Sequence, residues 1–218
     1  MKERPIIFSN EMVLAILEGR KTQTRRVIKP QPYQPTLEYR RMPPVFLESG
    51  EWGWSLDGEI AGPFIRCPYG QPGDRLWVKE VWRPIRVGPN KVTYIEYRAD
   101  GARIYKDHTY QPSWSKEEPW RSSLFMPRKY SRIDLEITNI RAERLQDISE
   151  EDAKAEGITG PFDVGYPAYR MPGDSKPRYS RPSGAFEDYW NLLNAKRGFG
   201  WSVNPWVWAL SFKRVSAA

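Results

Sequence analysis

The sequence predicts an α+β fold with many short, mostly antiparallel strands and a few short helices. Three observations predict it: segments in which apolar and polar residues alternate, an Asp-Gly turn between two β-prone runs, and two helices that begin at Ser and end at Gly. A length of 218 residues suits one domain with a full hydrophobic core. We therefore expect a single domain over residues 1–218.

The first elements are a strand over residues 5–8 and a helix behind it. Ser9 has the side chain of a helix N-cap, and Gly19 stands where a left-handed C-terminal cap is needed. Residues 22–28 then contain several β-branched side chains, which favour a strand. The segment predicts a helix, a tight turn and a strand.

The same signals place the remaining elements. Asp100-Gly101 between β-prone runs predicts a hairpin, and Ser149 followed by acids and closed by Gly157 predicts a helix of barely two turns. The expected elements are strands over 75–82, 92–98, 102–106, 133–145 and 205–215, and helices over 149–157 and 184–195.

Two stretches rich in Pro and Gly interrupt this pattern, at about 29–72 and at 159–183. Proline removes a backbone donor, so the prolines that recur through the first stretch argue against a continuous β-ladder. We expect both to be insertions into the domain, the first of them long and only partly ordered.

The charge balance favours polyanions as partners. The formal net charge is +7 and the isoelectric point is about 9.4, so nucleic acid is the first candidate. No run approaches the roughly 20 apolar residues of a membrane span, and the first residues lack the apolar stretch of a secretory signal. We expect a cytoplasmic protein without a membrane partner.

Cysteine and histidine are too scarce for a metal site. The chain has one cysteine, Cys67, and one histidine, His108, so neither an intrachain disulfide nor a Cys/His zinc site can form. Both residues are expected to be structural, and we expect neither a metal nor a cofactor.

Four sequence blocks resemble a known family. They are the helix with Gly-Arg-Lys-Thr-Gln-Thr-Arg-Arg at 19–26, Gly-Asp-Arg-Leu-Trp-Val at 73–78, Ile-Ser-Glu-Glu-Asp-Ala-Lys-Ala-Glu-Gly at 148–157, and Trp-Val-Trp-Ala-Leu-Ser-Phe at 206–212. Their order and content resemble the ASCH domain family, a branch of the PUA-like superfamily, and especially its longer bacteriophage and prophage versions. The blocks cover roughly half of the chain, and the two insertions go beyond the minimal domain.

The resemblance implies a small, mostly antiparallel β-barrel with flanking helices, in a bacterial cell or a phage that infects one. It implies a positively charged cleft suited to RNA or to modified nucleosides. Small bacterial members are amidohydrolases that remove the acetyl group from N4-acetylcytidine with a Lys, a Thr and a Glu. The matching residues are Lys21, Thr24 and Glu156. Other members bind or cut RNA.

These three residue types suit amide hydrolysis. The Thr24 hydroxyl is a nucleophile only if a base takes its proton, and a neutral Lys21 is such a base. Burial, or the neighbouring cations Arg20, Arg25 and Arg26, would lower the lysine pKa. Glu156 would orient Lys21 or carry a proton to the leaving amine, whereas backbone amides at the Gly19 turn would help stabilise the oxyanion.

Lys21 and Thr24 would point to opposite faces of an ideal strand, so the hypothesis requires Lys21 to lie in the turn. A plainer interpretation remains open beside it. The cations of residues 20–26 would then form a solvated strand face, and Thr24 would be an ordinary strand residue.

A second set of residues is a candidate nucleic-acid surface. Rings and cations interleave around Lys79 and Trp82, as in grooves that bind single strands, and Arg128 and Lys129 belong to a basic run that would follow phosphates. Together with Arg20, Arg25 and Arg26 they are the predicted binding residues. Core packing is the favoured interpretation for most tryptophans, and a charge run is usually plain surface.

Three functions therefore stay open. The first is a hydrolase that removes an acyl group from the N4 amine of cytidine or a related modified base, free or within a polynucleotide. The second is an RNA-binding module without catalysis, and the third is a metal-independent ribonuclease that uses the same basic cleft.

Overall fold

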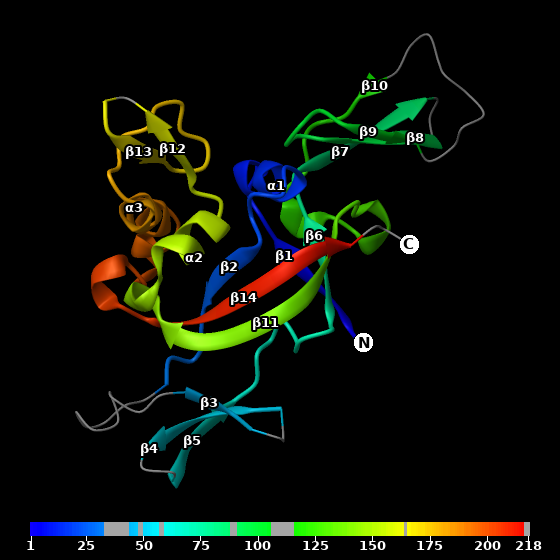
Figure 1. Ribbon diagram of the computed structural model, residues 1–218. Helices are drawn as coiled ribbons and strands as arrows, with labels where there is room; N and C mark the ends of the chain where they lie inside the picture. Colours follow the sequence, from blue (N-terminus) through cyan, green and yellow to red (C-terminus); the bar gives the residue numbers. More distant parts are fainter. Residues whose placement is uncertain are drawn as a thin grey trace.

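A computed structural model gives the fold (Figure 1). It describes residues 1–32, 44–47, 50–56, 59–87, 91–105, 116–163 and 165–215, so His108 lies outside the described residues. Mostly antiparallel strands and few helices confirm the expected α+β class. None of the helices in this part of the chain is both long and apolar enough to cross a bilayer.

A five-stranded sheet is the centre of the molecule. Its strands, in hydrogen-bonded order, are β1 (Glu3–Ile7), β6 (Arg75–Lys79), β11 (Asp134–Arg144), β14 (Trp206–Val215) and β2 (Gln23–Val27). β1 and β6 run parallel, and the other neighbours are antiparallel. The two edge strands, β1 and β2, therefore come from the same N-terminal segment.

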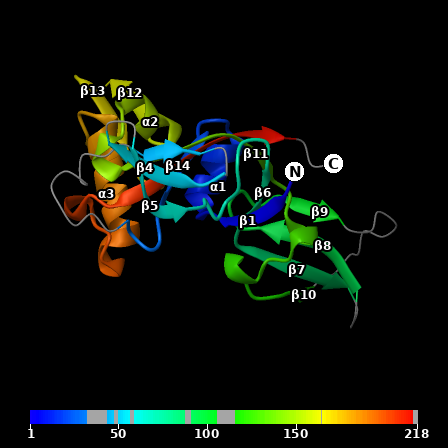
Figure 2. The ribbon, with the colours of Figure 1, turned by 90° about the horizontal axis from the view of Figure 1, so that it is seen from below.

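Three smaller sheets surround the central one. β7 (Trp82–Val87), β8 (Lys91–Tyr97), β9 (Arg103–Tyr105) and β10 (Lys116–Glu117) form one of them, in which β8 and β9 are the expected hairpin. This sheet and the hairpin of β12 (Thr159–Asp163) and β13 (Pro167–Arg170) lie at opposite ends of the molecule (Figure 2). The expected strand over 75–82 is divided, because β6 ends at Lys79 and β7 begins at Trp82.

The first of the two Pro- and Gly-rich stretches is more regular than its prolines suggested. It contains a three-stranded sheet of β3 (Pro44–Phe46), β4 (Trp52–Leu56) and β5 (Glu59–Ile65), in that order. Pro44 and Pro63 are accommodated because β3 and β5 are its edge strands, where a missing donor breaks no inner ladder. The second stretch likewise holds β12 and β13.

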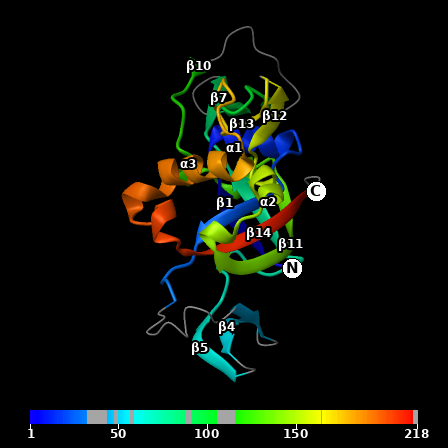
Figure 3. The same ribbon diagram turned by 60° about the vertical axis from the view of Figure 1, so that its left-hand side comes forward.

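The first two helices begin and end where their caps predict. Ser9 accepts a hydrogen bond from the Met12 amide at the start of α1 (Asn10–Leu17), and Ser149 caps α2 (Glu150–Ala155) in the same way. Gly19 and Gly157 follow these helices with positive φ of 75° and 104°. The third helix is α3 (Pro182–Asn194), which lies on the side of the molecule that carries β1 and β2 (Figure 3).

Short 3-10 turns complete the described chain. They are η2 (Ser123–Phe125), η3 (Arg128–Tyr130), η4 (Leu145–Asp147), η5 (Ala195–Arg197) and η6 (Trp201–Val203). η5 continues directly from α3 and carries exposed cations.

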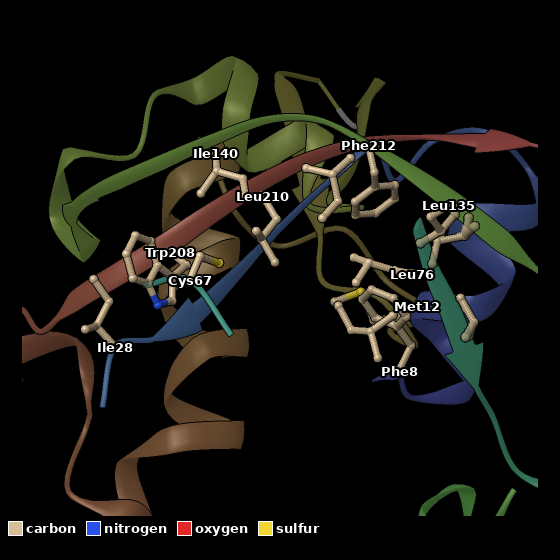
Figure 4. Packing of buried hydrophobic residues seen from close by; sticks show 14 of the residues in the cluster. Phe8, Met12, Ile28, Cys67, Leu76, Leu135, Ile140, Trp208, Leu210 and Phe212 are labelled. Carbon is tan, nitrogen blue, oxygen red and sulfur yellow. The ribbon is translucent and has the colours of Figure 1, made fainter. Parts of the chain in front are cut away.

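The central sheet curls around its hydrophobic core, and β11 arches over the buried side chains (Figure 4). Phe8, Leu76, Leu135 and Phe212 are among the fully or nearly fully buried members. The curl brings the edges together, since the Arg26 Nη2 donates to the Ile7 carbonyl at 2.6 Å. The expected barrel is thus a rolled sheet in which, over the described residues, a side chain and no backbone ladder joins β1 to β2.

Candidate functional site

A cavity of about 600 Å³ opens between the two edge strands. Residues 5–7 of β1 and 24–27 of β2 form its sides, and the α3 face of Phe186, Tyr189 and Trp190 covers it. Cavities that bind small molecules or cofactors typically have about 300 to 1,000 Å³. The unpaired edges of the rolled sheet therefore frame a space of ligand size.

Lys21 lies at the floor of this cavity. β2 begins only at Gln23, so Lys21 is still in the turn after α1, where its amide donates to the Ala15 carbonyl at 2.9 Å. Its side chain is 1% exposed. The turn conformation that the catalytic hypothesis requires is present.

The lysine ammonium has three acceptors. Nζ lies 2.6 Å from Glu156 Oε2, 2.9 Å from the Glu156 carbonyl and 2.7 Å from the Gln23 carbonyl. Burial lowers the pKa of Lys21 to about 8, Glu156 opposes this change, and Arg26 and Arg25 add to it. A measurable fraction of Lys21 is therefore neutral near neutral pH.

Glu156 contacts Lys21 although 135 residues separate them in the sequence. It is the C-cap of α2, and the Thr22 amide donates to the Ala155 carbonyl at 2.9 Å, which ties the end of α2 to the start of β2. Oε1 also accepts from Arg25 Nη1 at 3.4 Å. The carboxylate therefore holds both cations in place.

Thr24 lines the same cavity from the second position of β2. It is only 3% exposed, and its backbone pairs with Leu210 of β14. Within the described part of the chain its hydroxyl makes no hydrogen bond, unlike the amine of Lys21. Because Thr24 lines the cavity, a ligand there can reach it.

Arg25 also lines the cavity, and an ionic network holds its guanidinium. Its side chain has 0% exposure, and its Nη2 donates to Glu143 Oε1 at 2.6 Å and to Asp152 Oδ2 at 2.8 Å. Arg141 Nη2 donates to the same Asp152 oxygen at 2.6 Å. Arg25 therefore lines the cavity with a guanidinium that is fixed by carboxylates from other elements.

The other two cations of the motif differ in position. Arg26 faces the cavity, with its guanidinium 5.1 Å from the centre of the Phe8 ring. Arg20 is not among the lining residues and donates to Glu18 at 2.7 Å and to Thr159 Oγ1 at 3.1 Å. Backbone amides from Gly19 to Thr22 already donate to carbonyls, so they are not free oxyanion donors.

The second group of predicted binding residues lies elsewhere. None of them lines the cavity. Trp82 is 2% exposed and packs on Tyr130, Lys79 donates to the Leu124 carbonyl, and Arg128 pairs with Glu3 and Asp134. Lys129 lies over the ring of Tyr130. The structure therefore divides the predicted site residues into two separate sets.

Several cavity residues were not predicted as site residues. Ser9 Oγ and the Tyr189 hydroxyl lie 3.3 Å apart, and Lys29, Asn194 and Arg197 lie along the cavity wall. The apolar stripe of the last helix indicated that Tyr189 is buried. Nothing in the sequence indicated that this stripe would face β1 and β2.

Over the described residues, no group of three or more His, Cys, Asp and Glu side chains is arranged to hold a metal ion. The ionisable groups of the floor are instead paired cations and carboxylates.

Comparisons with known proteins add little to this geometry. No family model matches the chain, and no curated protein matches it. A crystal structure of an ASCH domain from Lactobacillus crispatus JV V101 is similar over 99% of this chain and 81% of that one, at 13% identity and a TM-score of 0.39. That protein bears the family name that the sequence motifs suggested.

Proposed function

We propose that the protein is an amidohydrolase that removes an acyl group from the N4 amine of cytidine or of a related modified base. The observation that carries this proposal is the meeting of Lys21, Thr24 and Glu156 at one cavity. They come from a turn, a strand and a helix end that are far apart in sequence. The sequence resemblance to the ASCH family supplies the substrate class.

The chemistry follows from the protonation of Lys21. The neutral amine takes the proton of the Thr24 hydroxyl, whose oxygen attacks the acyl carbon. The C–N bond breaks as the Lys21 ammonium returns the proton to the departing nitrogen, which leaves an acyl ester on Thr24. Water then hydrolyses the ester, which restores the hydroxyl and releases the carboxylic acid.

Two neighbouring residues, Glu156 and Arg26, assist these reaction steps. Glu156 keeps Lys21 Nζ in place and stabilises its ammonium form, in which the proton is held between the two transfers. Arg26 shares a strand face with Thr24, so its guanidinium is the cation best placed to stabilise the oxyanion. Arg26 would thus stabilise the oxyanion in place of the backbone amides at the Gly19 turn.

The test is hydrolysis of N4-acetylcytidine by wild type, Thr24→Val and Thr22→Val. Thr22 is exposed, lies two residues away and does not line the cavity, so Thr22→Val is a matched control. We expect wild type and Thr22→Val to release acetate at equal rates and Thr24→Val to lose at least about 100-fold in kcat. No hydrolysis by correctly folded wild type would overturn the proposal.

An RNA-binding module without catalysis is the second candidate. It is favoured by one observation, namely that all three protons of the Lys21 ammonium already have acceptors. A lysine used in this way stabilises the floor and abstracts no proton. Binding of a labelled single-stranded RNA that weakens steeply with salt, without hydrolysis of N4-acetylcytidine, would favour this candidate. Cleavage of the same RNA would instead indicate the ribonuclease.

A further inference from the structure

The rim of the cavity carries cations without carboxylate partners. Arg26, Lys29 and Arg197 all line it, and no Asp or Glu among the described residues lies within ion-pair distance of any of them. Other arginines at the floor and in the β7–β10 sheet are paired. An unpaired cluster of one sign, at the mouth of a cavity, attracts a ligand of the opposite sign.

The cavity has little negative charge of its own. Glu156 is the acidic residue in its lining, and both of its oxygens already face Lys21 or Arg25. Arg25 is neutralised in turn by Glu143 and Asp152. The charge that remains uncompensated is therefore at the rim and is positive.

Two contacts hold Lys29 and the chain around Arg197 at one corner of the cavity. Lys29 Nζ lies 5.1 Å from the centre of the Phe199 ring, which joins the end of β2 to the chain after α3. Arg197 is two residues before Phe199, in the last position of η5. Trp190 Nε1 donates to the Phe199 carbonyl at 2.7 Å, so this corner is anchored to α3.

We propose that Lys29 and Arg197 form a phosphate subsite, and that the ligand of this cavity is a nucleotide and not a bare nucleoside. The inference rests on the proposed function for the base, which would lie between the rim and the Lys21 floor. The phosphate belongs either to a free mononucleotide or to a polynucleotide end, and the chemistry of recognition is the same for both.

The test measures binding, so it does not depend on catalysis. Titration calorimetry compares cytidine with cytidine monophosphate on wild type, Lys29→Ala, Arg197→Ala and Lys196→Ala. Lys196 is the exposed neighbour of Arg197 and does not line the cavity, so Lys196→Ala is a matched control. Charge-assisted hydrogen bonds to a phosphate should tighten binding about tenfold or more relative to cytidine.

We expect this preference in wild type and Lys196→Ala, and its loss in Lys29→Ala and Arg197→Ala. Equal affinity for cytidine and its monophosphate, or equal effects of Lys196→Ala and Arg197→Ala, would overturn the inference. Competition with a short single-stranded oligonucleotide distinguishes the sources: stronger binding of the oligonucleotide assigns the subsite to a polynucleotide, and weaker binding assigns it to a mononucleotide.

The two proposals can fail separately. Tight binding of cytidine monophosphate without any hydrolysis of its N4-acetyl form would keep the phosphate subsite and remove the amidohydrolase. Hydrolysis of N4-acetylcytidine with no preference for phosphorylated ligands would do the opposite.

Discussion

Two buried ion pairs in this molecule have similar geometry and different chemistry. At the cavity floor, Lys21 Nζ lies 2.6 Å from Glu156 Oε2. Beside the β7–β10 sheet, Arg132 donates to both oxygens of Glu80, at 2.9 and 2.8 Å, and Nη1 donates to Asp100 at 2.8 Å. Each pair joins segments distant in sequence, and each is shielded from water.

The cations of these pairs respond to burial in opposite ways. Burial lowers the pKa of Lys21 to about 8, because one carboxylate only partly offsets the loss of hydration. Burial also acts to lower the pKa of Arg132, yet Glu80 and Asp100 together raise it overall. An arginine held by two carboxylates remains charged, whereas a lysine held by one can give up a proton.

The opposite pKa shifts of Lys21 and Arg132 show that burial of a charge does not by itself mark a reactive site. Arg132 packs 4.1 Å from the centre of the Tyr97 ring and does not line the cavity. Lys21 and Thr24 line the same cavity. We therefore expect the Lys21 pair to govern activity and the Arg132 pair to govern stability.

The largest expected effect is the loss of activity in Lys21→Met. Methionine keeps the length of the side chain and removes the base, so kcat should fall by about 100-fold to 10,000-fold. The measurement is release of acetate from N4-acetylcytidine, and circular dichroism checks the fold. Activity within a few-fold of wild type would show that Lys21 is structural.

The next largest effect is the loss of stability in Arg132→Met. This change leaves Glu80, which is 1% exposed, without its bidentate partner, and breaking a buried pair in this way costs about 3 to 5 kcal/mol. Urea unfolding measures the cost. At temperatures where the variant is folded, its rate of hydrolysis should equal that of wild type. A large drop in rate without a change in stability would reverse the division between the two pairs.

A smaller effect is expected from Gly157→Ala. Gly157 has a φ of +104°, and a Cβ there would lie 3.3 Å from the Ala15 Cβ and 3.7 Å from the Lys21 Cβ. Gly198→Ala is the control, because Gly198 has a φ of +81° and open space around it. Both variants carry a backbone cost of about 1 to 2 kcal/mol, and Gly157→Ala should exceed the control through crowding.

Gly157→Ala should also change activity, because Gly157 lies next to the residues of the cavity floor. Crowding against the Ala15 Cβ should shift Ala15, whose carbonyl accepts from the Lys21 amide, and so move Nζ from Glu156. The rate of hydrolysis should therefore fall in Gly157→Ala and stay unchanged in Gly198→Ala. Equal stability and equal rates in the two variants would mean that the floor tolerates such displacement.

Local signals in the sequence predicted most of the elements but not their arrangement. Ser9, Gly19, Ser149 and Gly157 mark helix ends because capping depends on a few neighbouring residues. The sheet of β3, β4 and β5 was not expected, since Pro44 and Pro63 are tolerated only where a strand lies at an edge. Whether a strand lies at an edge depends on tertiary pairing, which the local sequence does not specify.

The site shows the same limit. The Lys-Thr-Glu set was proposed through a family resemblance, and the structure places all three at one cavity. The depth of Arg25 was missed because four cations in seven residues suggest a surface, whereas Glu143 and Asp152 neutralise one of them from other elements. Lys29 and Arg197 have no local signal, since only the packing of α3 brings them to the same rim.

The most direct test is a titration of the Lys21 amine itself. Nuclear magnetic resonance of lysine labelled with nitrogen isotope at Nζ, with Lys21→Met to assign the signal, follows its protonation in the folded protein without any substrate. We expect a midpoint near pH 8, and a rate of hydrolysis that rises with pH through the same midpoint because the neutral amine is the base. A Lys21 that stays charged as far as an ordinary exposed lysine, to about pH 10, would contradict the account.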